Sequence, residues 1–243
     1  GVEVAADDPR GLLRLTGLIA SDRDPPWALA LGKTSLKGTL SVKTLAAGQQ
    51  AGFDVAGSSG EYTISASGNA AGAGMSELSG TFDLASKTSA GMARLIGLTA
   101  AADDQLPGHV TVTATAEPTG GYRSDVQAQM FGVQGGFNGT LAAPAARADG
   151  KLSLRSTDLS PLAAALGVPL RTVPRALMVL DAKVGGDEKS IALTAIDGRI
   201  GDEPINGELK LSSAAKLTGK LNVGALSLTD LLPPVFLAWY GTV

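Results

Sequence analysis

The chain has 243 residues, 44% of them hydrophobic, so it can bury a core and disorder is not the expected state. Its formal net charge is -3 and it contains no basic run, which argues against nucleic acid as a partner. The absence of cysteine excludes disulfides and thiolate metal sites, and no apolar run reaches the roughly 20 residues of a membrane-spanning helix.

The composition favours extended structure. Aromatic residues make up only 4% of the chain, whereas 32 glycines accompany many Ala, Ser and Thr residues. Small side chains of this kind suit β-strands joined by tight turns better than a bulky globular core.

The first 18 residues predict the end of a truncated repeat. An acidic pair at Asp7 and Asp8, a proline, several leucines and Gly17 indicate a short capped helix without a complete strand before it. Because the chain starts at Gly1 within this repeat, we expect it to be a piece of a longer protein. Residues 19–33 are interpreted as a connection, with a short strand at 27–32 as one option.

Alternating apolar and polar residues then predict four strands, at 38–45, 52–56, 61–67 and 79–84. In the first of them Leu40 and Val42 share one face and Thr39 and Ser41 the other. Residues 68–74 are interpreted as a loop, with a flat Gly/Ala strand as the alternative. A helix is expected at about 89–96.

The same order of elements follows in the second unit. Strands are predicted at 108–117, 124–130, 137–141 and 150–155, and the first has the cleanest alternation, with Val110 and Val112 facing away from Thr111. Ser160 is expected to cap a short helix that has Pro161 in its first turn, and Gly167 to end it in a left-handed conformation.

The third unit begins near residue 175 with a run that is apolar on both faces and is therefore expected to be more deeply covered. A turn at 185–188 leads to predicted strands at 190–196, 205–211 and 217–223. The last segment, 231–243, is apolar, but Pro233 and Pro234 interrupt it and it is too short to span a membrane.

These units repeat. Gly80, Gly150 and Gly219 open equivalent strands at spacings of 70 and 69 residues. A shared period of this size predicts an array in which each unit packs on its neighbours, divided as residues 1–18, 19–98, 99–168 and 169–243. The predicted fold is mostly β: an elongated, curved, largely antiparallel sheet of four to five strands per unit, with one short helix in each.

Nothing in the sequence requires an enzyme, a cofactor or a metal. His109 is the only histidine and is interpreted as a solvated strand residue. For the acidic pairs Asp7-Asp8 and Asp103-Asp104, helix capping or loop solvation is favoured over metal binding, and Asp187-Glu188 is interpreted as turn polarity. The glycine clusters at 132–136 and 198–201 lack the Lys and Ser/Thr of a nucleotide loop.

Two features leave alternatives open. Trp27 and Trp239 fit packing over the end of a sheet better than anchoring at a membrane interface, although indole suits both sites. The apolar strand faces would ordinarily pack against helices. Since one short helix per unit is too little to cover four or five strands, part of the concave face is expected to stay open as an apolar trough.

The repeated motifs carry a resemblance. Gly150-Lys-Leu-Ser-Leu with Asp158-Leu-Ser-Pro-Leu, Gly219-Lys-Leu-Asn-Val with Leu228-Thr-Asp-Leu-Leu, and Gly198-Arg-Ile-Gly with Ile205-Asn-Gly-Glu-Leu resemble the C-terminal repeat region of AsmA-like proteins of Gram-negative bacteria. The resemblance covers nearly the whole chain, and residues 38–80 match least well.

The resemblance implies a protein of the periplasm, anchored in the inner membrane and related to the bridge-like lipid transfer proteins. It implies that an apolar β-groove holds the acyl chains of phospholipid in support of outer-membrane biogenesis, without a cofactor or a reaction. The implied partners are phospholipid, the inner and outer membranes, and outer-membrane assembly proteins. The residues expected to line the groove occupy matching places in three units: Leu40, Val42, Val110, Val112, Leu177 and Val179.

Two other classes remain open. One is a scaffold that offers a strand edge for outer-membrane protein assembly and binds no lipid. The other is an enzyme or carbohydrate-binding solenoid, which would need a ladder of aromatic or acidic residues. With three Tyr, two Trp and no repeating acidic position, the sequence lacks such a ladder.

Overall fold

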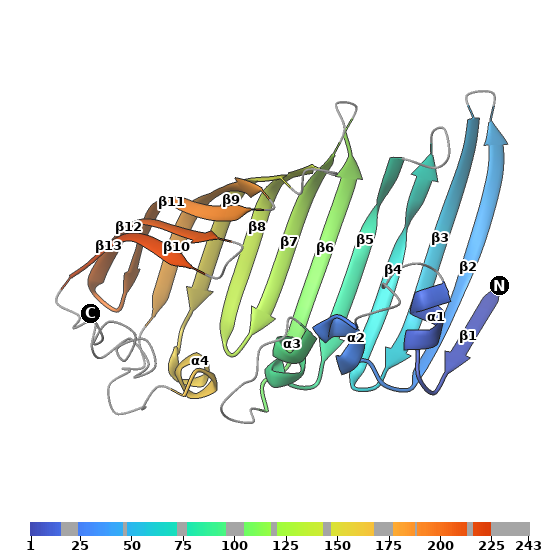
Figure 1. Cartoon of the computed structure of the whole chain (residues 1–243), viewed down its shortest axis with the longest axis horizontal. Coiled ribbons are helices and arrows are strands. Elements are labelled where there is room, and N and C mark those ends of the chain that lie inside the picture. Colours follow the sequence, from blue (N-terminus) through green and yellow to red (C-terminus); the bar gives the residue numbers. More distant parts are fainter. Residues whose placement is uncertain are drawn as a thin grey trace.

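The structure is a computed structural model that describes residues 1–15, 24–45, 48–71, 77–95, 105–117, 121–142, 147–167, 177–187, 189–212 and 216–224. These residues form one sheet of 13 strands, and its spatial order is the order of the chain, β1 to β13 (Figure 1). Every pair of neighbouring strands is antiparallel. The predicted fold class, an elongated and curved antiparallel sheet with few short helices, is confirmed.

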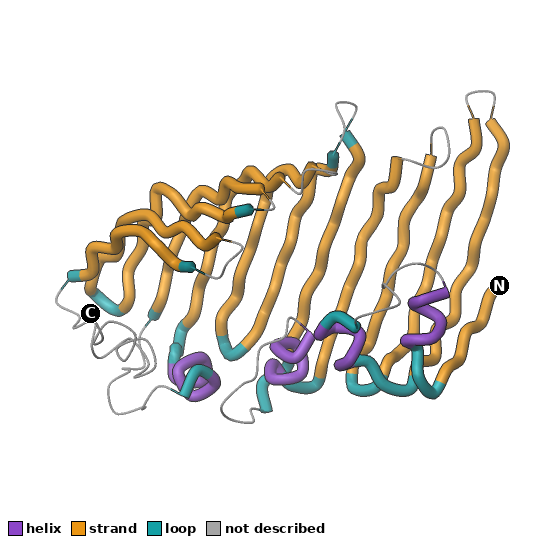
Figure 2. The backbone as a smooth tube through the Cα atoms, in the orientation of Figure 1, coloured by secondary structure: helices purple, strands orange, loops and turns teal. Residues whose placement is uncertain are grey.

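The strands are β1 (Val2–Ala6), β2 (Thr34–Leu45), β3 (Gly48–Ser59), β4 (Tyr62–Ala71), β5 (Glu77–Ser86), β6 (Gly108–Ala116), β7 (Tyr122–Met130), β8 (Val133–Ala142), β9 (Arg147–Ser156), β10 (Met178–Asp187), β11 (Ser190–Ile200), β12 (Glu203–Ser212) and β13 (Leu217–Val223). The helices are α1 (Arg10–Leu15), α2 (Pro26–Ala30), α3 (Ser89–Leu95) and α4 (Ser160–Ala165). All four helices lie along the same edge of the sheet (Figure 2). None of the described helices is long and apolar enough to cross a membrane.

Helices α3 and α4 each follow a run of four strands, and the chain enters both in the same way. Ser86 ends β5 and Ser156 ends β9, and both side chains are buried. The Ser86 hydroxyl accepts the backbone N–H of Thr88 at 3.3 Å, and the Ser156 hydroxyl accepts that of Asp158 at 3.2 Å. These local side-chain turns replace the strand ladder where it stops and redirect the chain into the helix.

Polar contacts hold α3 against the sheet. Ser89 is fully buried, its hydroxyl accepts the N–H of Phe131 at 2.8 Å, and it lies 3.1 Å from the carbonyl oxygen of Leu106. The buried Tyr62 donates its hydroxyl to the carbonyl oxygen of Gly91 at 3.0 Å. Burial raises the pKa of Tyr62, so this hydroxyl keeps the proton that it donates.

The turn of the hairpin between β7 and β8 packs against both α3 and α4. Phe131 and Gly132 have φ values of 50° and 74°, the left-handed pair of a two-residue hairpin turn. A phenylalanine in this conformation is strained. Its side chain is 7% exposed and packs in a cluster with Ala93 of α3 and Ala165 of α4, so burial between the helices compensates for the strained turn.

The C-terminal strands bend away from the direction of the others. The register between β10 and β11 shifts after Asp181, and Ala195 has a φ of 47°. A bulge of this kind bends a strand and increases its twist. In Figures 1 and 2 the ends of β12 and β13 run almost across the direction of β1–β8, and Ala182, Ile196 and Ile205 form a buried cluster there.

Several predicted elements differ from the structure. Residues 27–32 were predicted as a strand option, but α2 occupies 26–30: Pro25 is its extended N-cap residue and Pro26 is in the first turn, where proline is favoured. A five-residue strand, β1, precedes α1, where the sequence predicted no complete strand. In α4 the N-cap position is Leu159, which has no side-chain cap, and Ser160 is the first helical residue. The carboxylate of Asp158 accepts the N–H of Ser160 at 2.9 Å, so Ser160 is not the cap. Gly167 has a φ of 71°, as predicted.

Some predictions concern residues outside the described part. They include Asp103-Asp104, Glu188, Trp239, the segment 231–243 and the motif that starts at Leu228. Each predicted unit boundary, after residues 18, 98 and 168, also lies there, so the division into repeats stays a prediction. Of the segment 68–74, residues 68–71 belong to β4, which agrees with the strand alternative.

Candidate functional site: the apolar face of the sheet

One face of the sheet is apolar from its first strand to its last. Residues directly opposite each other in an antiparallel pair project to the same side, so the register traces rows of side chains across the sheet. One such row passes through all thirteen strands and contains no polar side chain: Val4, Leu36, Gly57, Ile64, Leu84, Val110, Ala128, Gly135, Leu154, Leu180, Gly198, Ile205 and Val223. We call the side that carries this row the apolar face.

The row beside it, displaced by one residue in each strand, projects to the other side, which we call the polar face. It consists of Glu3, Lys37, Ala56, Ser65, Asp83, Thr111, Gln127, Gly136, Ser153, Asp181, Asp197, Asn206 and Asn222. The two sides of the sheet therefore differ in chemistry over its whole length.

The apolar face is open to solvent over much of its area. Leu40 and Val42 are 64% and 53% exposed. The other large apolar strand residues exposed on this face are Val2, Val4, Leu78, Phe82, Leu141, Ile191, Leu211 and Leu217. Side chains of this size ordinarily gain about 1.5–3 kcal/mol each when they are fully buried, so a continuous exposed set is typical of a binding surface.

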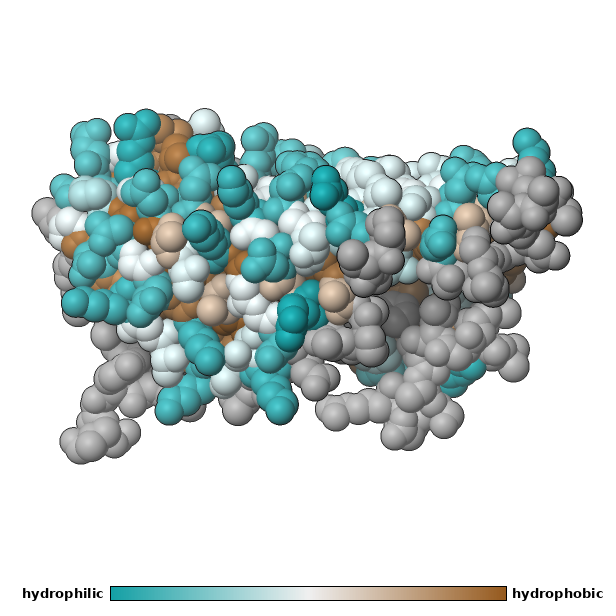
Figure 3. Space-filling model, turned by 90° about the horizontal axis from the view of Figure 1, so that it is seen from above, coloured by the Kyte–Doolittle hydropathy of each residue, from teal (hydrophilic) through white to brown (hydrophobic). Residues whose placement is uncertain are grey.

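The helices cover only one border of this face. Tyr62 and Gly108 belong to the apolar face at the ends of their strands, and α3 packs on both: Tyr62 bonds to Gly91, and a Cβ on Gly108 would lie 2.1 Å from Met92 Cγ. Leu40, Val42 and Leu78 lie toward the opposite strand ends. Figure 3 looks onto that opposite edge, and hydrophobic side chains are visible there between hydrophilic ones, chiefly over the C-terminal strands.

Aromatic rings lie over paired glycines within the face. Gly68 is opposite Gly80, and Gly139 is opposite Gly150. A Cβ on Gly68 would lie 2.9 Å from Phe53 Cζ, and one on Gly139 or Gly150 would lie 2.8 or 2.7 Å from the ring of Phe137. A ring that covers a strand glycine restores the packing that the missing side chain would supply. Few side chains therefore project from the apolar face at these positions. The face also has a hollow of about 200 Å³ between β1 and β3.

Four of the six predicted groove residues belong to this face. Leu40 and Val42 lie on it in β2, and Val110 and Val112 in β6. Nothing in the structure tests whether they contact a lipid.

The register does not place the other two predicted residues on this face. Val179 lies opposite Arg155 and Arg199, on the polar face, and Leu177 precedes β10. The apolar residue that matches Val110 is Leu180, three positions after Leu177, and an odd shift along a strand exchanges the faces. Because residues 176–180 are all apolar, their sequence alone does not show which of them project to the apolar face. Met178 and Leu180 were the residues that sequence reasoning missed.

Two titratable side chains of the described strands, His109 and Asp125, have defined partners on the polar face. Within the described residues, no three His, Cys, Asp or Glu side chains are grouped to hold a metal ion. His109 is half exposed and its Nε2 lies 3.7 Å from Asp83 Oδ1 on the polar face. On the same face, the amide N–H groups of Asn138 and Gln127 lower the pKa of Asp125.

Comparison with protein-family models, with curated proteins and with solved structures finds no match for this chain. The geometry of the two faces is therefore the basis for assigning a function.

Proposed function

We propose that the chain holds phospholipid acyl chains against its apolar face, as a segment of a periplasmic lipid-transfer protein that supports outer-membrane biogenesis. One observation carries the proposal: the register aligns apolar side chains in an unbroken row through all thirteen strands, and much of that face is open to solvent. The resemblance of the repeat motifs to AsmA-like proteins supports the same assignment, including an inner-membrane anchor and access to both membranes.

The physical basis is the burial of hydrocarbon. Burial of an acyl chain is favourable by about 0.8 kcal/mol per CH₂ group removed from water. The Leu, Val, Ala and Gly residues of the apolar face can bury these groups without any specific polar contact. Thirteen strands spaced about 4.8 Å apart give the face a width on the order of 58 Å, longer than a single extended acyl chain. Because the row lacks polar side chains, a lipid could move along it without crossing a polar barrier.

Native mass spectrometry with lipid extraction, on protein purified in mild detergent, tests this proposal. Phospholipid bound to the wild-type chain is the expected result. Val112→Asp places a carboxylate on the apolar face and should abolish lipid co-purification. Thr115→Asp adds the same charge to the same strand, on the polar face opposite Arg123, and should leave the lipid content unchanged. Circular dichroism of both variants checks that the sheet is intact.

Lipid retained by Val112→Asp, or absent from the wild-type protein, would count against the proposal. The second outcome would favour the scaffold alternative, in which the sheet accepts a strand from another protein at its edge. Partner binding without lipid would identify that role.

A further inference from the structure

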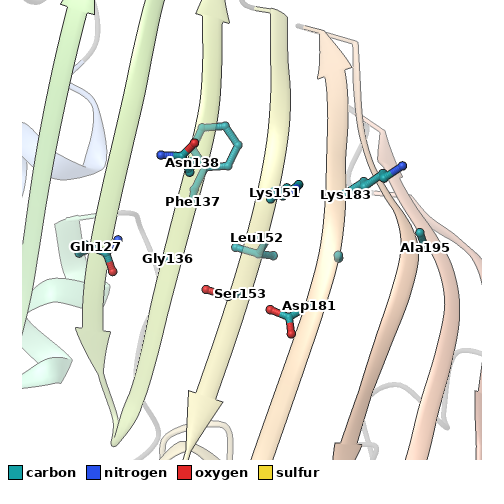
Figure 4. A pocket seen from close by; sticks show the side chains of 11 residues that line it. Gln127, Gly136, Phe137, Asn138, Lys151, Leu152, Ser153, Asp181, Lys183 and Ala195 are labelled. Atoms are coloured by element: carbon teal, nitrogen blue, oxygen red, sulfur yellow. The ribbon is translucent and has the colours of Figure 1, made fainter.

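The polar face contains two adjoining depressions between β7 and β11. Their volumes are about 400 and 570 Å³, and Asn138, Lys151 and Lys183 line both. Figure 4 shows the residues that line the first. The first opens over Gly136. A Cβ there would lie 3.0 Å from Ser153 Oγ and 3.2 Å from Gln127 Oε1, so the missing side chain makes the space.

Two lysines are juxtaposed at these depressions. Lys151 of β9 is directly opposite Lys183 of β10, and both side chains are exposed on the polar face. Like charges directly opposite each other destabilise a sheet. Neither lysine forms an ion pair or a side-chain hydrogen bond with another residue in the described part of the chain. Other cations on this face lie beside carboxylates: Arg123 is 3.0 Å from Glu117, and Lys37, far along the sheet in β2, is 3.3 Å from Glu3.

The carboxylates around the lysine pair bond to other residues or form no ion pair with the lysines. Asp125 accepts N–H groups from Asn138 and Gln127, each at 3.0 Å. Asp181 lies 3.4 Å from the guanidinium of Arg155.

Asp149 is the other carboxylate beside the lysines. It lies opposite Gly185, and no ion pair joins it to either of them among the described residues. The repulsion between the two ammonium groups is therefore not relieved by a bridging carboxylate.

We propose that Lys151 and Lys183 bind an oxyanion of the phosphate type in the depression over Gly136. An oxyanion between the two ammonium groups turns their repulsion into two charge-assisted hydrogen bonds, and lysine serves as a point charge for phosphate. The Ser153 hydroxyl lines the same depression and can donate a third bond. The site lies on the opposite side of the sheet from the apolar face, so it is independent of the acyl-chain proposal. The phosphate can come from a free anion or from a lipid headgroup.

Titration with inorganic phosphate at constant ionic strength, followed by calorimetry and by NMR of the backbone amides, tests the site. Saturable binding is expected, with amide shifts around Gly136 and Ser153. K151Q and K183Q should each weaken it roughly tenfold or more, the usual loss for a hydrogen bond to a charged group. K37Q removes the same charge from the same face and should leave the affinity within about twofold, because surface charges at this distance are largely screened.

A second arm identifies the source of the phosphate. Co-sedimentation with phosphatidylglycerol vesicles that depends on both lysines, and that inorganic phosphate competes away, would support the site with a lipid headgroup as its ligand. Phosphate binding without vesicle binding would support it with a free anion. Failure of both probes, or equal weakening by K37Q, would overturn the proposal.

Stability without ligand distinguishes a binding site from a structural role. In phosphate-free buffer K151Q should unfold at a higher denaturant concentration than the wild type, because the cross-strand repulsion is gone. Added phosphate should raise the unfolding midpoint of the wild-type protein and not that of K151Q. If K151Q were less stable than the wild type in phosphate-free buffer, the lysine pair would be structural and the proposal would fail.

Discussion

The two ends of the sheet carry the same alternation of apolar and polar residues but bury it to different extents. At the N-terminal end Leu40 and Val42 are more than half exposed, whereas Ile196 and Ile205 of the C-terminal strands are 4% and 7% exposed. The difference follows from the irregularity between Leu193 and Ile196, which bends β11 so that the apolar side chains beside the bend pack on one another. Farther from the bend, Ile191, Leu211 and Leu217 of β11–β13 are again about half exposed. The alternation decides which face is apolar, and the bend decides which of its residues are covered.

The largest effect that follows from this comparison is the cost of a charge on each part of the face. Ile196→Asp should lower the free energy of unfolding by about 3–5 kcal/mol, because it removes a packed side chain and buries a carboxylate without a partner. Val42→Asp, on the open part, should cost less than about 1 kcal/mol, as substitutions on exposed surfaces do. Urea denaturation followed by circular dichroism measures both. Equal costs at the two sites would show that β2 is covered in solution.

A smaller effect distinguishes a close-packed strand glycine, Gly68 of the apolar face, from Gly185 of the polar face, which has open space at its Cβ position. Gly68→Ala would place a Cβ 2.4 Å from the carbonyl oxygen of Ser79 and 2.8 Å from Gly80 Cα. The strands β4 and β5 would have to separate, at a cost of about 1–3 kcal/mol in the free energy of unfolding.

Gly185→Ala in β10 is the matched control, because nothing lies within 4 Å of its Cβ position. Its effect should stay within about 0.5 kcal/mol, or be stabilising through the lower entropy of the unfolded chain. The same denaturation experiment compares the two variants. If Gly68→Ala were as mild as Gly185→Ala, the Gly68–Gly80 pair would not set the spacing of the strands at the open end.

Much of the fold was predictable because its signals are local. The alternation at 108–117 corresponds to β6, and the helix expected at about 89–96 is α3 at 89–95. Strands rich in Gly and Ser were underestimated: the strand predicted at 52–56 is β3, residues 48–59. These residues have weak strand propensity of their own, but neighbouring strands on both sides supply the hydrogen bonds that extend them.

The sites depended on information that is not local. Val110 and Val112 could be assigned to one face from their own strand. Val179 could not, because residues 176–180 are all apolar and only pairing with Arg155 and Arg199 shows which face it is on. The lysine pair is harder still. Lys151 and Lys183 are far apart in the sequence, and their juxtaposition follows from the register between β9 and β10, which no short motif encodes.

The smallest expected effect is a loss of stability at low pH. It should be similar at both ends of the sheet, because the carboxylates involved lie at turns. Hydrogen bonds from the side chain and backbone of Arg10 lower the pKa of Asp8 to about 2, and the backbone N–H groups of Lys189 and Ser190 lower that of Asp187. Since both folded pKa values lie below the ordinary 3.8, these carboxylates stabilise the fold above about pH 4, and that contribution is lost as the pH falls toward 2.

Thermal unfolding between pH 5 and pH 2 in steps of about half a unit would show this loss as a falling midpoint. Asp8→Asn and Asp187→Asn should each flatten the profile, the first at the open end and the second at the bent end. Because exposed carboxylates contribute little individually, each change should be smaller than those of the glycine variants. A profile unchanged in Asp187→Asn would mean that its bonds to Lys189 and Ser190 do not hold the β10–β11 turn, and that the packing of Ile196 and Ile205 maintains the bend without them.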